Sequence, residues 1–314
     1  MRVLVHEYAS GSGAALPASI VAEGCAMRDA LCADLAAVPE IELLLSAAPG
    51  LPPPPCGARV TPRAGERDTD FLLRAAAGAD AVWLVAPESA GIALALVRAL
   101  EQAGIPVLGC TSEAVALASS KSRTLARLSE AGIDTAPTWP LAAAPLARHR
   151  AWAIKPDCGC GCEEARRLSA AQAEELRRRE ATDGRIAQTW LPGLAMSLSL
   201  RVAGGNVELL SVNRQHIAVA ADGALSLQGL TQGVALPPQA PQTNLAALAR
   251  HIVQAIPGLR GFVGVDFVLG VDGRATVLEV NPRLTSAYVG LSARLGRNLA
   301  AEILADFVEE ACNV

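Results

Sequence analysis

Apolar and polar positions alternate through residues 262–269 and again through residues 274–280, which is the period of a β-strand with one buried face. Residues 270–273, between the two runs, read Gly-Val-Asp-Gly, a composition typical of a tight turn. The pattern therefore predicts a β-hairpin. Its simplest register pairs Leu269 with Arg274 across the turn.

Two carboxylates and an amide share one face of this predicted hairpin. In the simplest register Asp266 lies opposite Val277, on the side that also carries Glu279 and Asn281. Such oxygen atoms suit Mg²⁺, which proteins usually hold with one or two carboxylates and substrate phosphates. Arg283 follows, with a planar fork that can bind phosphate or carboxylate. Solvated edge charges are the alternative for any one of these residues, but the four together predict a magnesium and phosphate site.

The first 110 residues alternate between short apolar runs and amphipathic stretches. The pattern predicts strands at residues 2–8, 41–46, 81–86 and 107–109, and helices at residues 19–37, 71–77 and 89–103. This alternation is typical of a parallel sheet with helices on both faces, whose ligands gather at the carboxyl ends of the strands. Glu7, Ser10 and Gly11 are therefore candidate substrate residues, with a plain turn and a solvated acid as the alternative.

The remaining residues form two further predicted parts. The first begins with a helix from residue 111 that reaches a second helix start at 119–121. A strand at residues 152–156, a polar helix at 169–179 and a strand at 185–191 follow. The second has strands at residues 196–202 and 206–212, the hairpin, and helices at 243–256 and 296–312. The sequence thus predicts an α/β protein with three parts: an amino-terminal parallel-sheet domain (1–110), a small middle lobe (111–192) and a carboxyl-terminal α+β lobe (193–314).

Composition narrows the class of protein. Of the 314 residues, 51% are hydrophobic and 18% are charged, which favours a globular protein with a substantial core. A net charge of −4 and 3% aromatic residues provide no electrostatic or stacking basis for a nucleic-acid or membrane partner. No signal-peptide pattern or membrane-length apolar run is present, and the eight cysteines are expected to be reduced thiols. We expect a cytoplasmic enzyme with small-molecule substrates, and a homodimer is left open.

Lysine is rare in this chain. Only two of its 27 basic residues are lysines, Lys121 at a predicted helix start and Lys155 at the end of a short apolar strand. A compact ammonium and a guanidinium are not interchangeable where a phosphate oxygen meets a single point charge. The two lysines could have been retained by chance, but their positions at a helix start and a strand end favour phosphate binding.

Glycines and cysteines alternate in the loop at residues 157–163, which is called the lid below. Gly159 and Gly161 allow the backbone to approach phosphates closely. The three alternating cysteines could instead bind a metal. Zinc and iron–sulfur sites usually use Cys-x-x-Cys pairs completed by a second cluster, and the sequence offers no such cluster. A phosphate lid is therefore predicted.

The order of these parts resembles the ATP-grasp fold. The motifs are a lysine that opens a helix, Lys155-Pro before a glycine-rich loop, the run Gln188-Thr-Trp-Leu-Pro-Gly, and Asp266, Glu279 and Asn281-Pro. The resemblance implies ATP with Mg²⁺, or Mn²⁺ in its place, and an adenine hinge formed by Gln188, Thr189, Trp190 and Leu191. This sequence departs from the family at Ser120, where an aspartate is frequent, and at residues 194–200, which lack the usual glutamate for ribose.

The head of the chain is similar to the tyramine–L-glutamate ligase family of methanofuran-type cofactor assembly. Residues 6–13 (HEYASGSG), residues 23–27 (EGCAM), Ala86-Pro-Glu and Asn281-Pro-Arg-Leu-Thr-Ser carry this similarity. It implies an ATP-dependent ligase that activates the γ-carboxyl of L-glutamate as an acylphosphate, joins it to tyramine, and releases ADP and phosphate.

The resemblance also assigns roles to residues of this chain. Arg283 and Lys155 would be catalytic, and the substrates would meet Glu7, Ser10, Gly11, Arg214, Arg283 and Ser286. Two alternatives stay open. One is an ATP-grasp ligase for a different amino acid and amine, and the other is a nucleotide-binding regulator without turnover.

Overall fold

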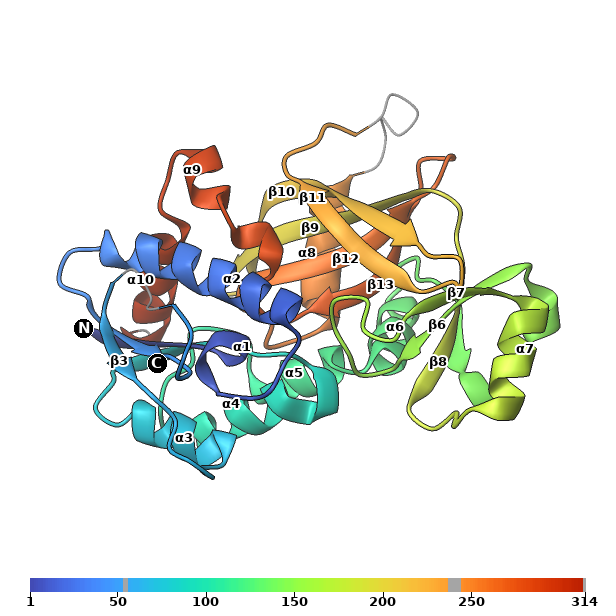
Figure 1. Cartoon of the computed structure of the whole chain (residues 1–314). Coiled ribbons are helices and arrows are strands. Elements are labelled where there is room, and N and C mark those ends of the chain that lie inside the picture. The colour runs from blue at the N-terminus through green and yellow to red at the C-terminus, as the bar shows by residue number, and fades with distance from the viewer. Residues whose placement is uncertain (53–55, 237–243, 313–314) are drawn as a thin grey trace.

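Three sheets form the frame of the protein, and each belongs to a different part of the chain (Figure 1). The structure is a computed structural model that describes residues 1–52, 56–236 and 244–312. The amino-terminal sheet and the small middle sheet lie at opposite ends of the molecule in Figure 1, and the carboxyl-terminal sheet lies between them. None of the described helices is long and apolar enough to cross a membrane.

The amino-terminal sheet is parallel, as predicted, with the strand order β3-β2-β1-β4. Its strands are β1 (Arg2–Glu7), β2 (Glu42–Ser46), β3 (Ala58–Val60) and β4 (Ala81–Val85). Helices cover both faces, so successive side chains of β1 enter different cores: Val3 packs with α2 (Ala18–Ala36), whereas Leu4 packs with α3 (Asp68–Ala75) and α4 (Ile92–Gln102).

Three details of this part differ from the prediction. The stretch 107–109 makes only a single parallel bridge, between Val107 and Val82, and is not a full strand. The predicted helix at 89–103 is broken into a short 3-10 turn, η1 (Ser89–Gly91), and α4, because Ala90 and Gly91 have left-handed backbone angles (φ 53° and 71°). The three residues of β3 are too few to show a period, so the sequence did not predict them.

The middle sheet is antiparallel, with the order β5-β8-β6-β7. Its strands are β5 (Thr138–Pro140), β6 (Ala151–Pro156), β7 (Arg166–Ser169) and β8 (Arg185–Thr189). Helix α7 (Ala170–Arg179) covers one face and begins with a capping box between Ser169 and Gln172. The helices α5 (Ser112–Ala118) and α6 (Lys121–Glu130) lead into the sheet. The sequence predicted β6, β8 and α7 but not the short strands β5 and β7.

The carboxyl-terminal sheet has the order β11-β10-β9-β12-β13. Its strands are β9 (Leu194–Ala203), β10 (Asn206–Val219), β11 (Leu225–Thr231), β12 (Gly261–Leu269) and β13 (Ala275–Asn281). Helix α8 (Leu245–Ala255) packs on one face, and the residue proposed for its start, 243, lies outside the described residues. The predicted closing helix, 296–312, is α10 (Leu299–Cys312), which begins three residues later than expected. The short helix α9 (Leu291–Leu295), which ends at the left-handed Gly296, was not predicted.

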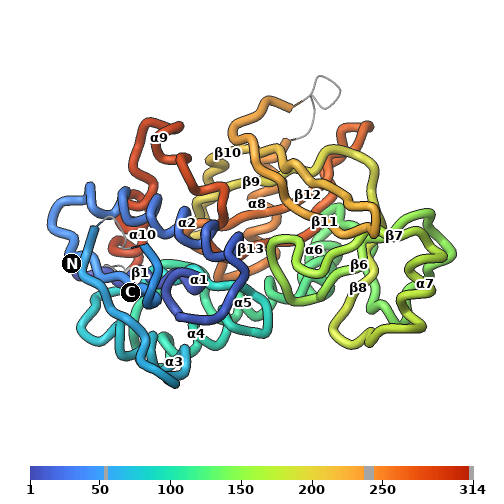
Figure 2. The backbone as a smooth tube through the Cα atoms, in the orientation of Figure 1, coloured from blue at the N-terminus to red at the C-terminus, as the bar shows by residue number. Residues whose placement is uncertain are grey.

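Two connections join the middle and carboxyl-terminal sheets. The segment before β5 pairs with β13, since Val277 donates to the Asp134 carbonyl and accepts from Ala136 N–H. On the other side the tip of the β10–β11 hairpin meets β7, where Gly223 O accepts from Arg167 N–H at 2.8 Å. Between these connections α6 lies against β13 (Figure 2). The two sheets are thereby joined at two separate places.

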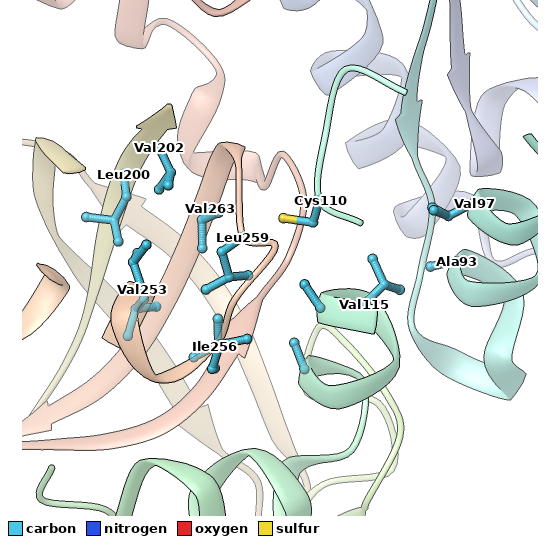
Figure 3. Close-up of a cluster of buried hydrophobic side chains, with 14 of the residues drawn as sticks. Ala93, Val97, Cys110, Val115, Leu200, Val202, Val253, Ile256, Leu259 and Val263 are labelled. Carbon is cyan, nitrogen blue, oxygen red and sulfur yellow. The ribbon is translucent and has the colours of Figure 1, made fainter. Parts of the chain in front are cut away.

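A continuous apolar core extends from the amino-terminal to the carboxyl-terminal part. Figure 3 shows Val97 of α4 and Val115 of α5 on one side of Cys110, and Ile256, Leu259 and Val263 on the other. All of these side chains are buried. The two larger parts therefore share one apolar core, and the smaller middle sheet packs beside them.

Candidate active site

The β12–β13 hairpin forms as predicted, but its register differs. The expected pairing of Leu269 with Arg274 is wrong, because Leu269 pairs with Ala275. A β-bulge at Leu278 then shifts the pairing by one more residue, so Asp266 lies directly opposite Glu279. Directly opposed residues share a face of a sheet, and the two carboxylates are therefore closer than the simple register implied.

Two side-chain amides contact Asp266, one from the neighbouring strand β13 and one from β10, on the far side of β9. Asn281 donates from Nδ2 to Asp266 Oδ2 at 3.3 Å, which leaves the Asn281 amide oxygen as its possible metal ligand. Gln215 donates from Nε2 to Asp266 Oδ1 at 3.0 Å. Sequence analysis missed Gln215 because β10 continues past the predicted end at residue 212, so no strand pattern aligned this residue with the hairpin.

Two ammonium groups converge on the second carboxylate. Lys121 Nζ lies 3.4 Å and Lys155 Nζ lies 3.6 Å from Glu279 Oε2. Burial opposes ionisation of Glu279, but the two lysines outweigh burial and lower its pKa. Burial and then the Glu279 charge raise the pKa of Asp266. The ionised form is thus favoured at Glu279 and disfavoured at Asp266.

The two lysines come from different elements. Lys121 is the first residue of α6, as predicted, with Ser120 as its N-cap, and Lys155 lies near the end of β6. Both side chains are largely buried. Lys121 Nζ also donates a hydrogen bond to the carbonyl of Gly159 in the lid. Burial lowers the pKa of Lys155, whereas the charges of Glu279 and Glu88 outweigh burial and raise the pKa of Lys121.

The lid has no regular secondary structure and crosses between two parts of the protein. Ser89, at the end of the amino-terminal sheet, donates to Glu163 Oε2 at 2.7 Å and lies 3.9 Å from the sulfur of Cys160. Gly161 is left-handed (φ 61°), a conformation that glycine adopts without strain. The lid is therefore held between the lysines on one side and η1 on the other.

The lid cysteines, Cys158, Cys160 and Cys162, are free thiols. Burial raises the pKa of each, that of Cys162 to about 11, so they are protonated near neutral pH. Within residues 1–52, 56–236 and 244–312, no three His, Cys, Asp or Glu side chains are gathered to hold a metal ion. This part of the structure gives the cysteine run no metal-binding partners.

The predicted adenine hinge lies at the end of β8. Gln188 is buried and donates from Nε2 to Thr138 Oγ1 at 3.1 Å and to the carbonyl of Leu278, the bulge residue, at 3.5 Å. Through this contact the bulge of the β12–β13 hairpin touches the predicted hinge. The N–H groups of Thr189 and Trp190 bond neighbouring carbonyls, and Leu191 follows directly after the strand.

Arg283 contacts Glu88, the glutamate of the Ala86-Pro-Glu motif. Its guanidinium bonds both carboxylate oxygens of Glu88, at 2.9 and 3.0 Å, and both side chains are largely buried. Burial opposes the charge of Arg283, but Glu88 outweighs burial and raises its pKa. A cavity of about 20 Å³ lies beneath the pair. The segment after β4 therefore contacts the segment after β13.

Other predicted substrate residues are not brought to this cluster. Ser10 and Gly11 lie buried in the short helix α1 (Tyr8–Gly11), and the Glu7 carboxylate accepts the N–H groups of Ala9 and Ser10. Arg214 pairs with Met196, whose buried side chain lies on the α8 face of the sheet, so Arg214 and Asp266 are on opposite faces. Ser286 begins the half-buried turn η4 (Ser286–Tyr288) after Arg283.

Comparison with known proteins agrees with this geometry. Residues 118–287 match the ATP-grasp domain, and residues 41–115 match the pre ATP-grasp 3 domain. The chain is 27% identical over 212 residues to tyramine–L-glutamate ligase of Methanocaldococcus jannaschii, a match that covers 68% of this chain and 58% of that relative. The chain thus spans less than two thirds of the length of this curated relative.

Solved structures share the fold over nearly the whole chain. An ATP-grasp superfamily protein from Archaeoglobus fulgidus has a TM-score of 0.77 at 24% identity, covering 97% of this chain and 88% of that one. The L-amino acid ligase of Bacillus licheniformis has a TM-score of 0.68 at 17% identity, covering 96% and 73%. At these identities the likeness concerns the fold.

Proposed function

The chain belongs to the ATP-grasp family, and from this premise we propose that it is an ATP-dependent carbon–nitrogen ligase. One observation carries the proposal. Both lysines of the chain lie within 3.6 Å of a single carboxylate oxygen of Glu279, directly opposite Asp266. Buried ammonium groups beside a pair of carboxylates are what binding of a metal–phosphate complex requires.

The donor set fits Mg²⁺. Asp266, Glu279 and the amide oxygen of Asn281 are hard oxygen ligands, and burial together with the Glu279 charge already raises the pKa of Asp266. A divalent cation between the carboxylates would remove that repulsion. When bound, Mg²⁺ would neutralise charge on phosphate oxygens; Mn²⁺ has the same ligand preference.

The residues of the chain then divide the work of phosphoryl transfer. Lys121 and Lys155 would neutralise phosphate oxygens of ATP, while Gly159 and Gly161 would bring lid N–H groups close to them. The end of β8, from Gln188 to Leu191, would hold adenine through its backbone. Arg283 would bind the substrate carboxylate and then its acylphosphate, which an amine attacks to form an amide and release phosphate, with ADP as the other product.

The substrates are proposed from the relative's name. A tyramine–L-glutamate ligase at 27% identity supports L-glutamate as the acid and tyramine as the amine. Reaction at the γ-carboxyl and a place in a methanofuran-type pathway are proposed from the sequence resemblance alone. Arg283 lies just before the turn η4 and Ser286 begins it, and we assign both residues to binding of the acid. Glu7, Ser10, Gly11 and Arg214 stay predicted substrate residues, and the proposal does not depend on them.

Release of ADP tests the proposal directly. Protein mixed with Mg-ATP, L-glutamate and tyramine should release ADP, and the amide product should be identified by mass spectrometry. Omission of either the acid or the amine should stop amide formation. ADP release only with another amino acid and amine would retain the ligase and replace its substrates. ATP binding without turnover in a broad acid and amine screen would instead identify a nucleotide-binding regulator.

A further inference from the structure

Asp157, the first residue of the lid, is tied to the start of α6 by four hydrogen bonds. Its carboxylate accepts from Ser122 N–H at 2.7 Å, from Ser120 Oγ at 2.6 Å and from Ser122 Oγ at 3.0 Å. Its carbonyl accepts from Lys121 N–H at 3.0 Å. The Asp157 N–H in turn donates to Gly184 O. One residue therefore fixes the first turn of the lysine helix to the beginning of the lid.

The contact has a clear physical basis. The first N–H groups of a helix have no partners within the helix, and the positive end of the helix dipole favours a carboxylate. Asp157 supplies that carboxylate from a different segment, 36 positions after Lys121 in the sequence. Two residues further into the lid, Gly159 O accepts from Lys121 Nζ. The lid thus contacts both the backbone and the side-chain end of the same lysine.

We propose that Asp157 is a positioning residue, which couples the lid to Lys121 so that this ammonium and the lid reach the ATP phosphates together. The inference rests on the proposed function, because it takes phosphate as the ligand of Lys121. Asp157 itself touches no reacting atom. Without it the start of α6 and the lid would move independently, and the Lys121 ammonium would lose its fixed place beside Glu279.

The first test needs no nucleotide. In Asp157→Ala, a thiol reagent should label Cys160 and Cys162 faster than in wild type, as followed by mass spectrometry, because the lid opens more readily. Asp183→Ala is the matched control, since Asp183 is an exposed acid in the neighbouring loop that ends at Gly184. Wild-type labelling rates in Asp157→Ala would overturn the proposal.

The second test separates positioning from general stability. Loss of a charge-assisted contact should raise the KM for ATP of Asp157→Ala by about tenfold, with the KM for the amine unchanged. A loss of folded protein alone would lower kcat and leave both KM values unchanged. Faster labelling with an unchanged KM for ATP would also overturn the proposal. Asp157 would then hold the lid in place but would not position Lys121 for ATP.

A rescue variant completes the design. Ser120→Asp combined with Asp157→Ser reverses the carboxylate–hydroxyl pair and keeps a carboxylate at the helix N-terminus. We expect it to recover much of both the labelling protection and the KM for ATP. Failure of this swap to improve on Asp157→Ala in either measurement would contradict the coupling. If wild type binds no ATP, the proposed function fails, while the labelling test still decides whether Asp157 holds the lid.

Discussion

Two glutamates with little exposed side-chain surface lie at or near strand ends in this protein, and their surroundings differ. Glu7 ends β1, and its carboxylate accepts the backbone N–H groups of Ala9 and Ser10. Glu279, near the end of β13, lies between two ammonium groups and opposite a second carboxylate. Both residues were predicted functional residues. Glu279 pairs with two ammonium groups from separate elements, whereas the charge of Arg28 on α2 favours ionised Glu7 without outweighing burial.

The difference appears in their pKa values. Burial raises the pKa of Glu7, and the hydrogen bonds of Ser10 and Ala9 offset this only in part. At Glu279 burial acts in the same direction, but Lys121 and Lys155 outweigh it and lower the pKa. An acid at a strand end is therefore a weak indication of a site. Opposite charges from separate elements are a stronger indication of a site, because burying each charge costs desolvation free energy.

The largest expected effect is at the hairpin. Asp266→Asn and Glu279→Gln should each abolish amide formation and ADP release while the fold stays intact, because each removes a carboxylate from the proposed metal site. Steady-state assays at saturating Mg²⁺, with circular dichroism for the fold, measure this. Glu7→Gln is the matched control and should retain ATP turnover. Near wild-type turnover in either hairpin variant would show that the hairpin does not bind the metal.

Lys121→Arg and Lys155→Arg probe the counter-charges that distinguish the two glutamates. Arginine keeps the charge but is longer and planar, so it should fit badly beside Glu279 and a phosphate. One impaired charge-assisted contact costs about 1.5–3 kcal/mol, so kcat/KM for ATP should fall by about one to two decades.

The control for these lysine variants is Arg178→Lys on α7, whose side chain is 66% exposed. It should leave kcat/KM for ATP unchanged. If both lysine variants match wild type, a compact ammonium is not needed at either position.

Local patterns account for what the sequence could predict. Alternation and a Gly-Val-Asp-Gly turn were enough for the β12–β13 hairpin, and helix capping at Ser120 placed Lys121 at a helix start. The register was wrong at two points, because the strands pair one residue farther along at the turn than the pattern indicated and the bulge at Leu278 has no residue signature. The contacts of Gln215 with Asp266 and of Arg283 with Glu88 join segments 51 and 195 positions apart, and no local period encodes such pairs.

The amino-terminal region also makes a pH prediction, which concerns stability. His6, beside Glu7, is fully buried, and neither ring nitrogen has a hydrogen-bond partner in the described structure. Burial lowers its pKa from 6.5 to about 4. Between these values the unfolded chain binds a proton that the folded protein does not, so stability is full above pH 6.5 and falls as the pH decreases toward 4.

From pH 7 to pH 5 this histidine should cost about 2 kcal/mol of unfolding free energy. His6→Leu removes the titration, so the variant should lose that much less than wild type over the same interval, as measured by chemical denaturation. Carboxylates titrate equally in both proteins and cancel in the comparison. Identical losses in the two proteins would mean that folding does not change the pKa of His6.

The smallest effect is expected at Glu7 itself. Glu7→Gln keeps one acceptor oxygen for the N–H groups of Ala9 and Ser10, and Glu7→Ala keeps none. Because a lost N-cap acceptor costs about 1 kcal/mol, the unfolding free energy should fall by about that amount in Glu7→Gln and by more in Glu7→Ala. The KM for ATP should stay at the wild-type value in both variants, because no ammonium or phosphate group depends on Glu7. A rise in the KM for the amine without loss of stability would instead assign Glu7 to substrate binding, and the two glutamates would then both belong to the site.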